Sequence, residues 1–277
     1  MALVPFPNQA PERLPDDDLE PEREDSALDD YEAGGKMSFL EHLDELRKRI
    51  IWAVVGVFAG FLVACFFIQQ LFDFIMKPLS AQLPAGASLV YTDPTEAFVL
   101  YIKIAAIAGL LIASPVVMTQ VWLFIAPGLY AHEKKMAIPF VMMSSIFFIG
   151  GAAFSHYVVF PLTWSFFVSF TTDYLTFMPR IEPAFSLYMK MALAFGLVFQ
   201  MPTVVLFLAR MGVVTARFLL RHIKYAVLII FIVAAVITPS GDMFTQTAMA
   251  GPMVLLYLLS ILLAWIFGKK KQVESEP

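Results

Sequence analysis

The sequence of 277 residues contains one cysteine, little charge and none of the short motifs that mark common enzymes. Its single cysteine, Cys65, excludes an internal disulfide and a cysteine-based metal cluster. No Walker motif, His-Glu-x-x-His or Gly-x-Ser-x-Gly is present, and none of the four histidines is paired with another ligand at helical spacing. We therefore expect a protein that is not an enzyme and that binds no cofactor or metal.

The low charge is accompanied by long apolar runs. Hydrophobic residues make up 59% of the chain and charged residues 15%, whereas soluble domains average about 45–50% and about 25%. The mean hydropathy is +0.74. This composition predicts a polytopic membrane protein.

Six apolar segments predict an all-α integral membrane protein with six transmembrane helices within residues 37–268. The fifth run, Tyr225 to Ile237, has only 13 residues, so we expect the last two spans to be short and the bilayer around the fifth to be thinned or shielded. A kink is expected at Ser114-Pro115, where a neighbouring helix or hydroxyl must replace a lost hydrogen bond. The predicted spans are about residues 50–70, 97–125, 136–160, 184–209, 223–238 and 244–267.

Both chain ends differ from this membrane domain in composition. Residues 1–36 are rich in proline and acid, and eleven of the 23 acidic residues lie in the first 33 positions. This segment lacks the pattern of a signal peptide and buries too little apolar surface to offset its chain entropy. We expect a disordered cytoplasmic tail there, and a basic, then polar cytoplasmic tail at residues 269–277.

Positive charge sets the predicted orientation. With the N-terminus inside, the inner segments hold most of the basic residues, including Arg47–Arg49 and Lys269–Lys271, while the outer loops hold Lys77 and Arg180. Six crossings with both termini in the cytoplasm satisfy the positive-inside rule.

The segment before the first span has the pattern of an amphipathic helix. Ser38 and Glu41 have the spacing of a capping box. We expect this helix to lie in the membrane interface and then turn into the bilayer. Its apolar side chains share one helical face: Phe39, Leu43, Leu46 and Ile50.

Three polar residues fall inside predicted spans, where charge is costly and often functional. Lys103 and Lys190 either snorkel to the outer interface or line a polar cavity between the second and fourth spans. Gln200 is deeper and needs a hydrogen-bond partner, on a neighbouring helix or on a substrate. Such a cavity would suit the alternative function, a secondary transporter for a small solute, although the sequence shows no convincing internal repeat.

Two carboxylates, Glu45 and Glu133, lie in predicted cytoplasmic segments. Glu45 can pair with Arg49 at i,i+4 spacing, and Glu133 can be neutralised by an adjacent lysine. Alternatively, both carboxylates face one cytoplasmic surface and bind a cationic ligand. Two guanidinium groups suit such a pair, because arginine binds carboxylate as a planar fork.

Three blocks of the sequence carry a family resemblance. The first runs from Phe39 to Arg49. The second comprises Ser114-Pro115, Gln120 to Tyr130 and His132 to Lys135, and the third is Thr238-Pro239-Ser240 with Asp242 and Gln246. In this order the blocks resemble the TatC family, the multispanning core of the twin-arginine protein translocase. The resemblance covers about residues 37–268.

The resemblance implies a receptor for signal peptides with two consecutive arginines. It would export folded proteins across the bacterial cytoplasmic (inner) membrane, driven by the proton-motive force. Glu45 and Glu133 match the family's carboxylates that read the arginines, and Phe124 matches a nearby aromatic position. We expect Arg49 to hold Glu45 in place until a peptide arginine competes for it.

Partners are also implied: single-span TatA-like and TatB-like subunits, further copies of this chain and membrane lipid, but no nucleic acid. Asp242 and Gln246 match polar positions near the start of the sixth span where single-span partners dock. Pro78 matches a position in the first external loop. At Gln200 the family usually has a glutamate, so a charge-based role does not carry over to this position.

Overall fold

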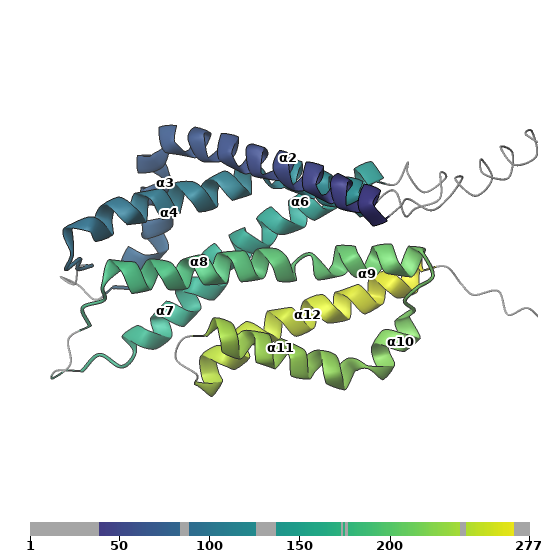
Figure 1. The fold of residues 1–277 in the computed structure, drawn as a ribbon. Helices are drawn as coiled ribbons and strands as arrows, with labels where there is room; N and C mark the ends of the chain where they lie inside the picture. Colours follow the sequence, from purple (N-terminus) through teal and green to yellow (C-terminus); the bar gives the residue numbers. More distant parts are fainter. Residues whose placement is uncertain are drawn as a thin grey trace, which may run out of the picture. The chain divides into compact units, whose positions relative to one another are not determined.

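The computed structural model describes residues 39–83, 89–125, 137–172, 174, 177–238 and 242–268. The chain up to Glu45 forms one unit and the chain from Leu46 onward a second. The packing described below is that of the second unit. Within the described residues the regular structure is helical (Figure 1), apart from isolated bridges such as that between Val90 and Arg180. The all-α prediction is confirmed.

Within the part of the chain that the structure describes, five helical segments are long and apolar enough to cross a membrane. Two of them are single helices, α2 (Phe39–Phe66) and α12 (Met243–Phe267). The others carry a break or a further helix: α4 (Pro94–Ile112) with α5 (Ser114–Ile125), α6 (Ala137–Phe154) with the π-helix η3 (Ser155–Val159) and α7 (Phe160–Val168), and α8 (Ile181–Val198) with α9 (Met201–Arg210). Shorter helices are α3 (Ile68–Ser80), α10 (Ala216–Arg221) and α11 (Ile223–Ile237).

The fifth and sixth spans differ in length. α11 has 15 residues, about 22 Å at 1.5 Å per residue, which is less than the roughly 30 Å of hydrocarbon in a typical bilayer. α12 has 25 residues, so the prediction that both last spans are short is wrong for the sixth. Its apolar sequence continues without a charge from Met243 to Phe267.

Two other boundaries differ from the predictions. α2 is one helix from Phe39 to Phe66, without the predicted turn after the interfacial segment, because no glycine or proline interrupts it before Gly56. The third span continues past Phe160 to Val168. Pro161 lies in the first turn of α7, where the missing N–H of proline is tolerated.

Prolines explain the breaks inside the second and fourth spans. Pro115 has no N–H for the Leu111 carbonyl, and the hydroxyl of Ser114 donates to that oxygen at 2.7 Å instead. The predicted kink and its compensating hydroxyl are both present. Pro202 likewise offers no donor to the carbonyl of Val198, the last residue of α8. The break leaves Gln200 between α8 and α9.

Close packing joins these helices into the second unit. α9 packs on α12, α6 on α8, and α11 on α12 (Figure 1). The backbones of α2 and α4 approach closely at Gly60 and Gly109, since both residues lack a side chain. A Cβ added at Gly60 would overlap the carbonyl oxygen of Gly109. The largest fully buried side chains include Phe160, Phe185 and Phe195.

Candidate functional site

The predicted signal-binding residues are only partly within the described chain. Glu45 and Arg49 both lie on α2, four residues apart, the spacing that places two side chains on one face of a helix. Phe124 lies in the last turn of α5. Glu133 lies in residues 126–136, outside the described residues. The convergence of Glu45 and Glu133 on one surface therefore stays a prediction.

An aromatic cluster holds the end of α5 that carries Phe124. Trp122 is 6% exposed, and its indole N–H donates to the Ser144 hydroxyl of α6 at 2.9 Å. Its ring stacks on Phe140 of α6 at 5.0 Å and meets Phe207 of α9 edge-on at 4.8 Å. These contacts fix α5 and α6 on either side of the connection that contains Glu133.

Gln200 makes a hydrogen bond between helices. Its side-chain amide donates to the carbonyl oxygen of Ser144 on α6 at 2.9 Å. The sequence left open whether the partner of Gln200 is a neighbouring helix or a substrate. In the structure the partner is a neighbouring helix, α6. Ser144 thus accepts from Trp122 through its hydroxyl and from Gln200 through its backbone.

Lys103 is bound to a carboxylate that the sequence did not point out. Its ammonium lies 2.8 Å from Glu182 in the first turn of α8, and Glu182 also accepts from the Ser186 hydroxyl at 2.9 Å. Lys103 therefore joins α4 to α8. Lys103 lies in the middle of α4 and Glu182 in the first turn of α8, so their positions in the sequence give no signal that the two side chains meet.

A second ion pair joins the same two helices, with the cation on the α8 side and the carboxylate on α4. Arg180, just before α8, bonds Glu96 in the first turn of α4. The backbone of Val90 pairs with this segment, accepting from Ile181 at 3.0 Å and donating to Pro179 at 3.1 Å. The first half of α4 and the start of α8 are therefore held together by two ion pairs and a short backbone bridge.

Asp93 caps α4 beside this junction. Its carboxylate accepts from the backbone N–H of Thr95 at 2.8 Å and from the Thr95 hydroxyl at 2.7 Å. The hydroxyl and then the backbone hydrogen bond hold the pKa of Asp93 below its ordinary value. This end of α4 is thus capped by an ionised carboxylate, which also suits the helix dipole.

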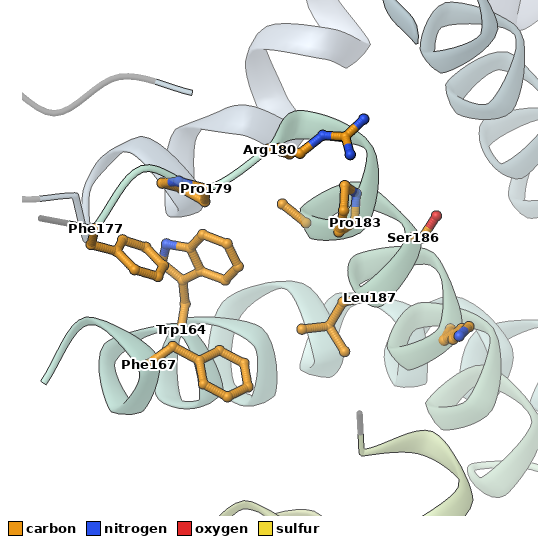
Figure 2. Close-up of a pocket in the computed structure, with 10 residues that line it drawn as sticks. Trp164, Phe167, Phe177, Pro179, Arg180, Pro183, Ser186 and Leu187 are labelled. Carbon is orange, nitrogen blue, oxygen red and sulfur yellow. The ribbon is translucent and has the colours of Figure 1, made fainter. Parts of the chain in front are cut away.

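Lys190 does not share a cavity with Lys103 and Gln200. It lines a pocket between α7 and α8 (Figure 2) whose lining includes neither of the other two residues. The polar cavity between the second and fourth spans stays a prediction, and Lys190 lies at a different pocket from Lys103 and Gln200. Because Lys103 and Gln200 use their polar groups between helices, the three residues form no common solute site among the described residues.

The predicted docking residues lie at two places. Asp242 caps α12 and accepts from the backbone N–H of Thr245 at 2.7 Å. Gln246 donates through its amide to the Phe231 carbonyl of α11 at 2.9 Å, so part of its hydrogen-bonding capacity ties α11 to α12. Pro78 lies inside α3, near its C-terminal end.

Comparison with known proteins places the fold in a family. A family model described as Sec-independent protein translocase protein (TatC) matches residues 41–252. The TatC of Koribacter versatilis is 44% identical over 239 residues, which cover 85% of this chain and 88% of that protein. The TatC of Desulforapulum autotrophicum is 42% identical over 241 residues, 87% of this chain and 89% of that protein.

Solved structures agree with the sequence relatives. One described as the crystal structure of the twin-arginine translocase receptor TatC matches with a TM-score of 0.72 at 37% identity, covering 81% of this chain and 98% of its own. The helices thus define a multi-pass membrane protein of the kind that carries other proteins across a bilayer. The chain belongs to the TatC family, the Sec-independent protein translocase proteins. The family resemblance found in the sequence is confirmed.

Proposed function

We propose that this chain is the receptor for twin-arginine signal peptides and the core subunit of a translocase that exports folded proteins. The observation that supports this most strongly is the TatC family match over residues 41–252, which contains Glu45, Phe124 and Glu133. The similar solved structures are described as twin-arginine translocase receptors. Family membership also implies that the chain works within a Tat complex that has other subunits.

Recognition rests on two carboxylates and an aromatic ring. Glu45 of α2 and Glu133 each take one guanidinium of the signal peptide as a bidentate pair. Phe124 offers a ring face on which an arginine can stack. The buried Trp122 cluster positions Phe124 and one end of the Glu133 connection. Arg49 neutralises Glu45 in the empty receptor and is displaced by the peptide arginine.

The membrane arrangement of the proposal follows the charge bias of the sequence. The chain lies in the bacterial inner membrane with both termini in the cytoplasm, and the tails 1–36 and 269–277 flank the membrane domain. Single-span TatA-like and TatB-like subunits dock near Asp242, Gln246 and Pro78, beside further copies of this chain. The proton-motive force supplies the free energy, since the sequence carries no nucleotide-binding motif.

The test is binding of a twin-arginine signal peptide to the full chain in membranes, measured by crosslinking. Glu45→Gln and Glu133→Gln are each expected to weaken binding about tenfold or more, because a hydrogen bond to a charged group is worth roughly 1.5–3 kcal/mol. Asp44→Asn, an exposed neighbour on α2, is the matched control and should leave binding unchanged. Arg-Arg→Lys-Lys in the peptide should weaken binding to the original chain and have little further effect on the double variant.

The proposal fails if the double variant binds the peptide as tightly as the original chain and does not distinguish Arg-Arg from Lys-Lys. A separate variant, Arg49→Gln, tests the proposed role of Arg49 through the affinity for the signal peptide. Arg49→Gln removes the internal competitor, so the affinity for the peptide should change, and an unchanged affinity would contradict that role while leaving the receptor assignment standing.

A further inference from the structure

Three basic side chains lie where α10 leads into α11. Arg217 and Arg221 are four residues apart on α10, the spacing that places two side chains on one face of a helix. Lys224 follows in the first turn of α11. All three residues are exposed, and we call them the basic patch.

The basic patch has no nearby carboxylate to neutralise it. The sequence contains neither Asp nor Glu from position 183 to position 241. None of the ion pairs in the described part of the chain includes a residue of the basic patch. The ammonium of Lys224 lies 5.1 Å from the centre of the Tyr225 ring, a contact that leaves its charge in place. The basic patch therefore attracts an anionic partner.

The C-terminal end of α12 extends well past the basic patch. α9 ends beside that end, since the Arg210 guanidinium lies 5.7 Å from the centre of the Phe267 ring. α10 packs further back on α12, where the hydroxyl of Tyr257 donates to the Leu219 carbonyl at 2.8 Å. Tyr257 precedes Phe267 by ten residues, about 15 Å along the axis, and helical side chains lean toward the N-terminus of their helix. α10 is thus recessed from the end of α12.

The lengths of α11 and α12 agree with this recess. Where the chain passes from one helix to the other, the Thr238 hydroxyl contacts the Met249 sulfur at 3.1 Å. The Gln246 amide donates to the Phe231 carbonyl at 2.9 Å nearby, so the two helices are close to level at these ends. α11 has 15 residues and α12 has 25. At the opposite ends α11 therefore falls short of α12 by about 15 Å.

The recess exposes charge and apolar surface side by side. Phe218, Leu220 and Tyr225 alternate with the basic residues, and each is more than half exposed. The last turns of α12 also expose apolar side chains, among them Leu262 and Ile266. In a membrane the apolar side chains need hydrocarbon, whereas the three cations need headgroups or water. An anionic phospholipid offers a charged headgroup and hydrocarbon in one molecule.

We propose that the basic patch binds the headgroups of anionic phospholipids from the adjacent membrane leaflet. Arg217 and Arg221 hold phosphate oxygens as planar forks, and Lys224 adds a point charge. The acyl chains lie against α11 and the last turns of α12 and fill the recess. A free phosphate or an acidic peptide would satisfy the cations but would leave the apolar side chains without hydrocarbon. The site includes none of the predicted signal-peptide residues.

The test uses the full chain purified in detergent and native mass spectrometry. Phosphatidylglycerol and phosphatidylethanolamine with identical acyl chains are compared, because both contain a phosphate but only the first carries a net charge. Phosphatidylglycerol should bind about fivefold more tightly or better. Arg217→Gln and Arg221→Gln should each weaken its binding about fivefold, the usual contribution of one basic residue near anionic lipid, and the double variant about 25-fold.

Arg47→Gln is the matched control. Arg47 is an exposed arginine on α2, outside the basic patch, and its replacement should leave the binding of phosphatidylglycerol unchanged. The thermal unfolding midpoint should stay the same in every variant, because the replaced side chains form no ion pair with the described part of the chain. A loss of lipid binding at an unchanged midpoint then reports the site and not misfolding.

Four results would overturn the proposal. The two lipids could bind equally, or Arg47→Gln could weaken binding as much as Arg217→Gln, which would show general charge attraction. Inorganic phosphate could displace phosphatidylglycerol at equal concentration, which would make the patch a site for free anions. Finally, a photoreactive side chain in place of Phe218 could crosslink in native membranes to a protein segment instead of lipid.

Discussion

The start and the middle of the fourth span are joined to neighbouring helices by different kinds of polar contact. At the start of α8, Glu182 and the adjoining Arg180 form ion pairs with Lys103 and Glu96 of α4. At the break between α8 and α9, Gln200 reaches α6 through a neutral amide. The first contact joins charges and the second joins dipoles, although both link helices of one membrane domain.

Burial accounts for the difference. The side chains of Lys103 and Glu182 remain 31% and 42% exposed, so water or headgroups still solvate the charges and the cost of pairing them is small. Ser144 and Trp122, which surround the Gln200 contact, are 2% and 6% exposed. An ion there would lose its solvation, whereas a neutral hydrogen bond satisfies both partners at lower cost. The Lys103–Glu182 pair thus joins charges where both side chains stay partly exposed, and the Gln200 contact is neutral where its neighbours are buried. In the Arg180–Glu96 pair only Arg180 is well exposed, since the Glu96 side chain is 9% exposed.

The largest expected effect comes from removing Trp122, the aromatic anchor beside the neutral contact of Gln200. Trp122→Ala should destabilise the protein by about 3–5 kcal/mol, because it opens a cavity between α5, α6 and α9 and leaves the Ser144 hydroxyl without its donor. Thermal unfolding in detergent, followed by circular dichroism, measures this. Trp265→Ala is the control, since Trp265 is 75% exposed on α12. Equal losses in the two variants would show that Trp122 is no special anchor.

Replacing the neutral hydrogen bond itself should cost less. Gln200→Leu keeps the apolar volume and removes the donor to the Ser144 carbonyl, and hydrogen bonds between membrane helices contribute about 0.6 kcal/mol on average and about 1.7 kcal/mol at most. The same unfolding measurement applies. Coupling between Gln200→Leu and Trp122→Phe in a double-mutant cycle would sharpen the comparison, because both contacts meet at Ser144. Strict additivity would mean that they act independently.

The Lys103–Glu182 ion pair at the start of α8 should contribute little to stability, despite its short distance. In a double-mutant cycle, Lys103→Met and Glu182→Gln should show a coupling of about 0.2–1 kcal/mol, as measured for other partly exposed pairs. Added salt should reduce that coupling, while it leaves the Gln200 contact unchanged. A coupling of several kcal/mol that is insensitive to salt would show that Lys103 and Glu182 are desolvated in the membrane.

The smallest effect should appear at Asp93 and depend on pH. Because the Thr95 hydrogen bonds lower its pKa in the folded state, Asp93 stabilises the fold above the ordinary carboxyl pKa. This contribution is lost as the pH falls through the lowered value. Asp93→Ala should therefore be less stable than the original chain near neutral pH, and the difference should shrink in acid. Unfolding midpoints measured across that range check the sign, and a difference that grows in acid would contradict it.

Several features of the fold could be predicted from sequence because they depend on local chemistry. Uncharged apolar runs and the proline at 115 predict spans and a kink, and the structure contains α4 and α5 with the Ser114 hydroxyl replacing the lost donor. The predicted turn after the interfacial helix was wrong, since α2 has no helix-breaking residue there. The bounds of the sixth span, about 244–267, agree with α12, and only its description as short was wrong.

The candidate site was predictable to a different degree. Glu45, Phe124 and Glu133 were found through family-like blocks, and the family match now covers all three. Glu182 and Arg180 were missed as the ion-pair partners of Lys103 and Glu96. No spacing rule connects Lys103 to a carboxylate 79 residues further along the chain.

The sequence by itself determined that this chain is a helical membrane protein of the TatC type, because hydropathy, charge bias and motif order are properties of the linear chain. Only the tertiary structure decided which polar groups meet. It paired Lys103 with Glu182 and Gln200 with Ser144, and left Lys190 beside the pocket of Trp164. The reason is physical: a buried or half-buried polar group needs a partner, and the identity of that partner depends on how helices distant in sequence pack against each other.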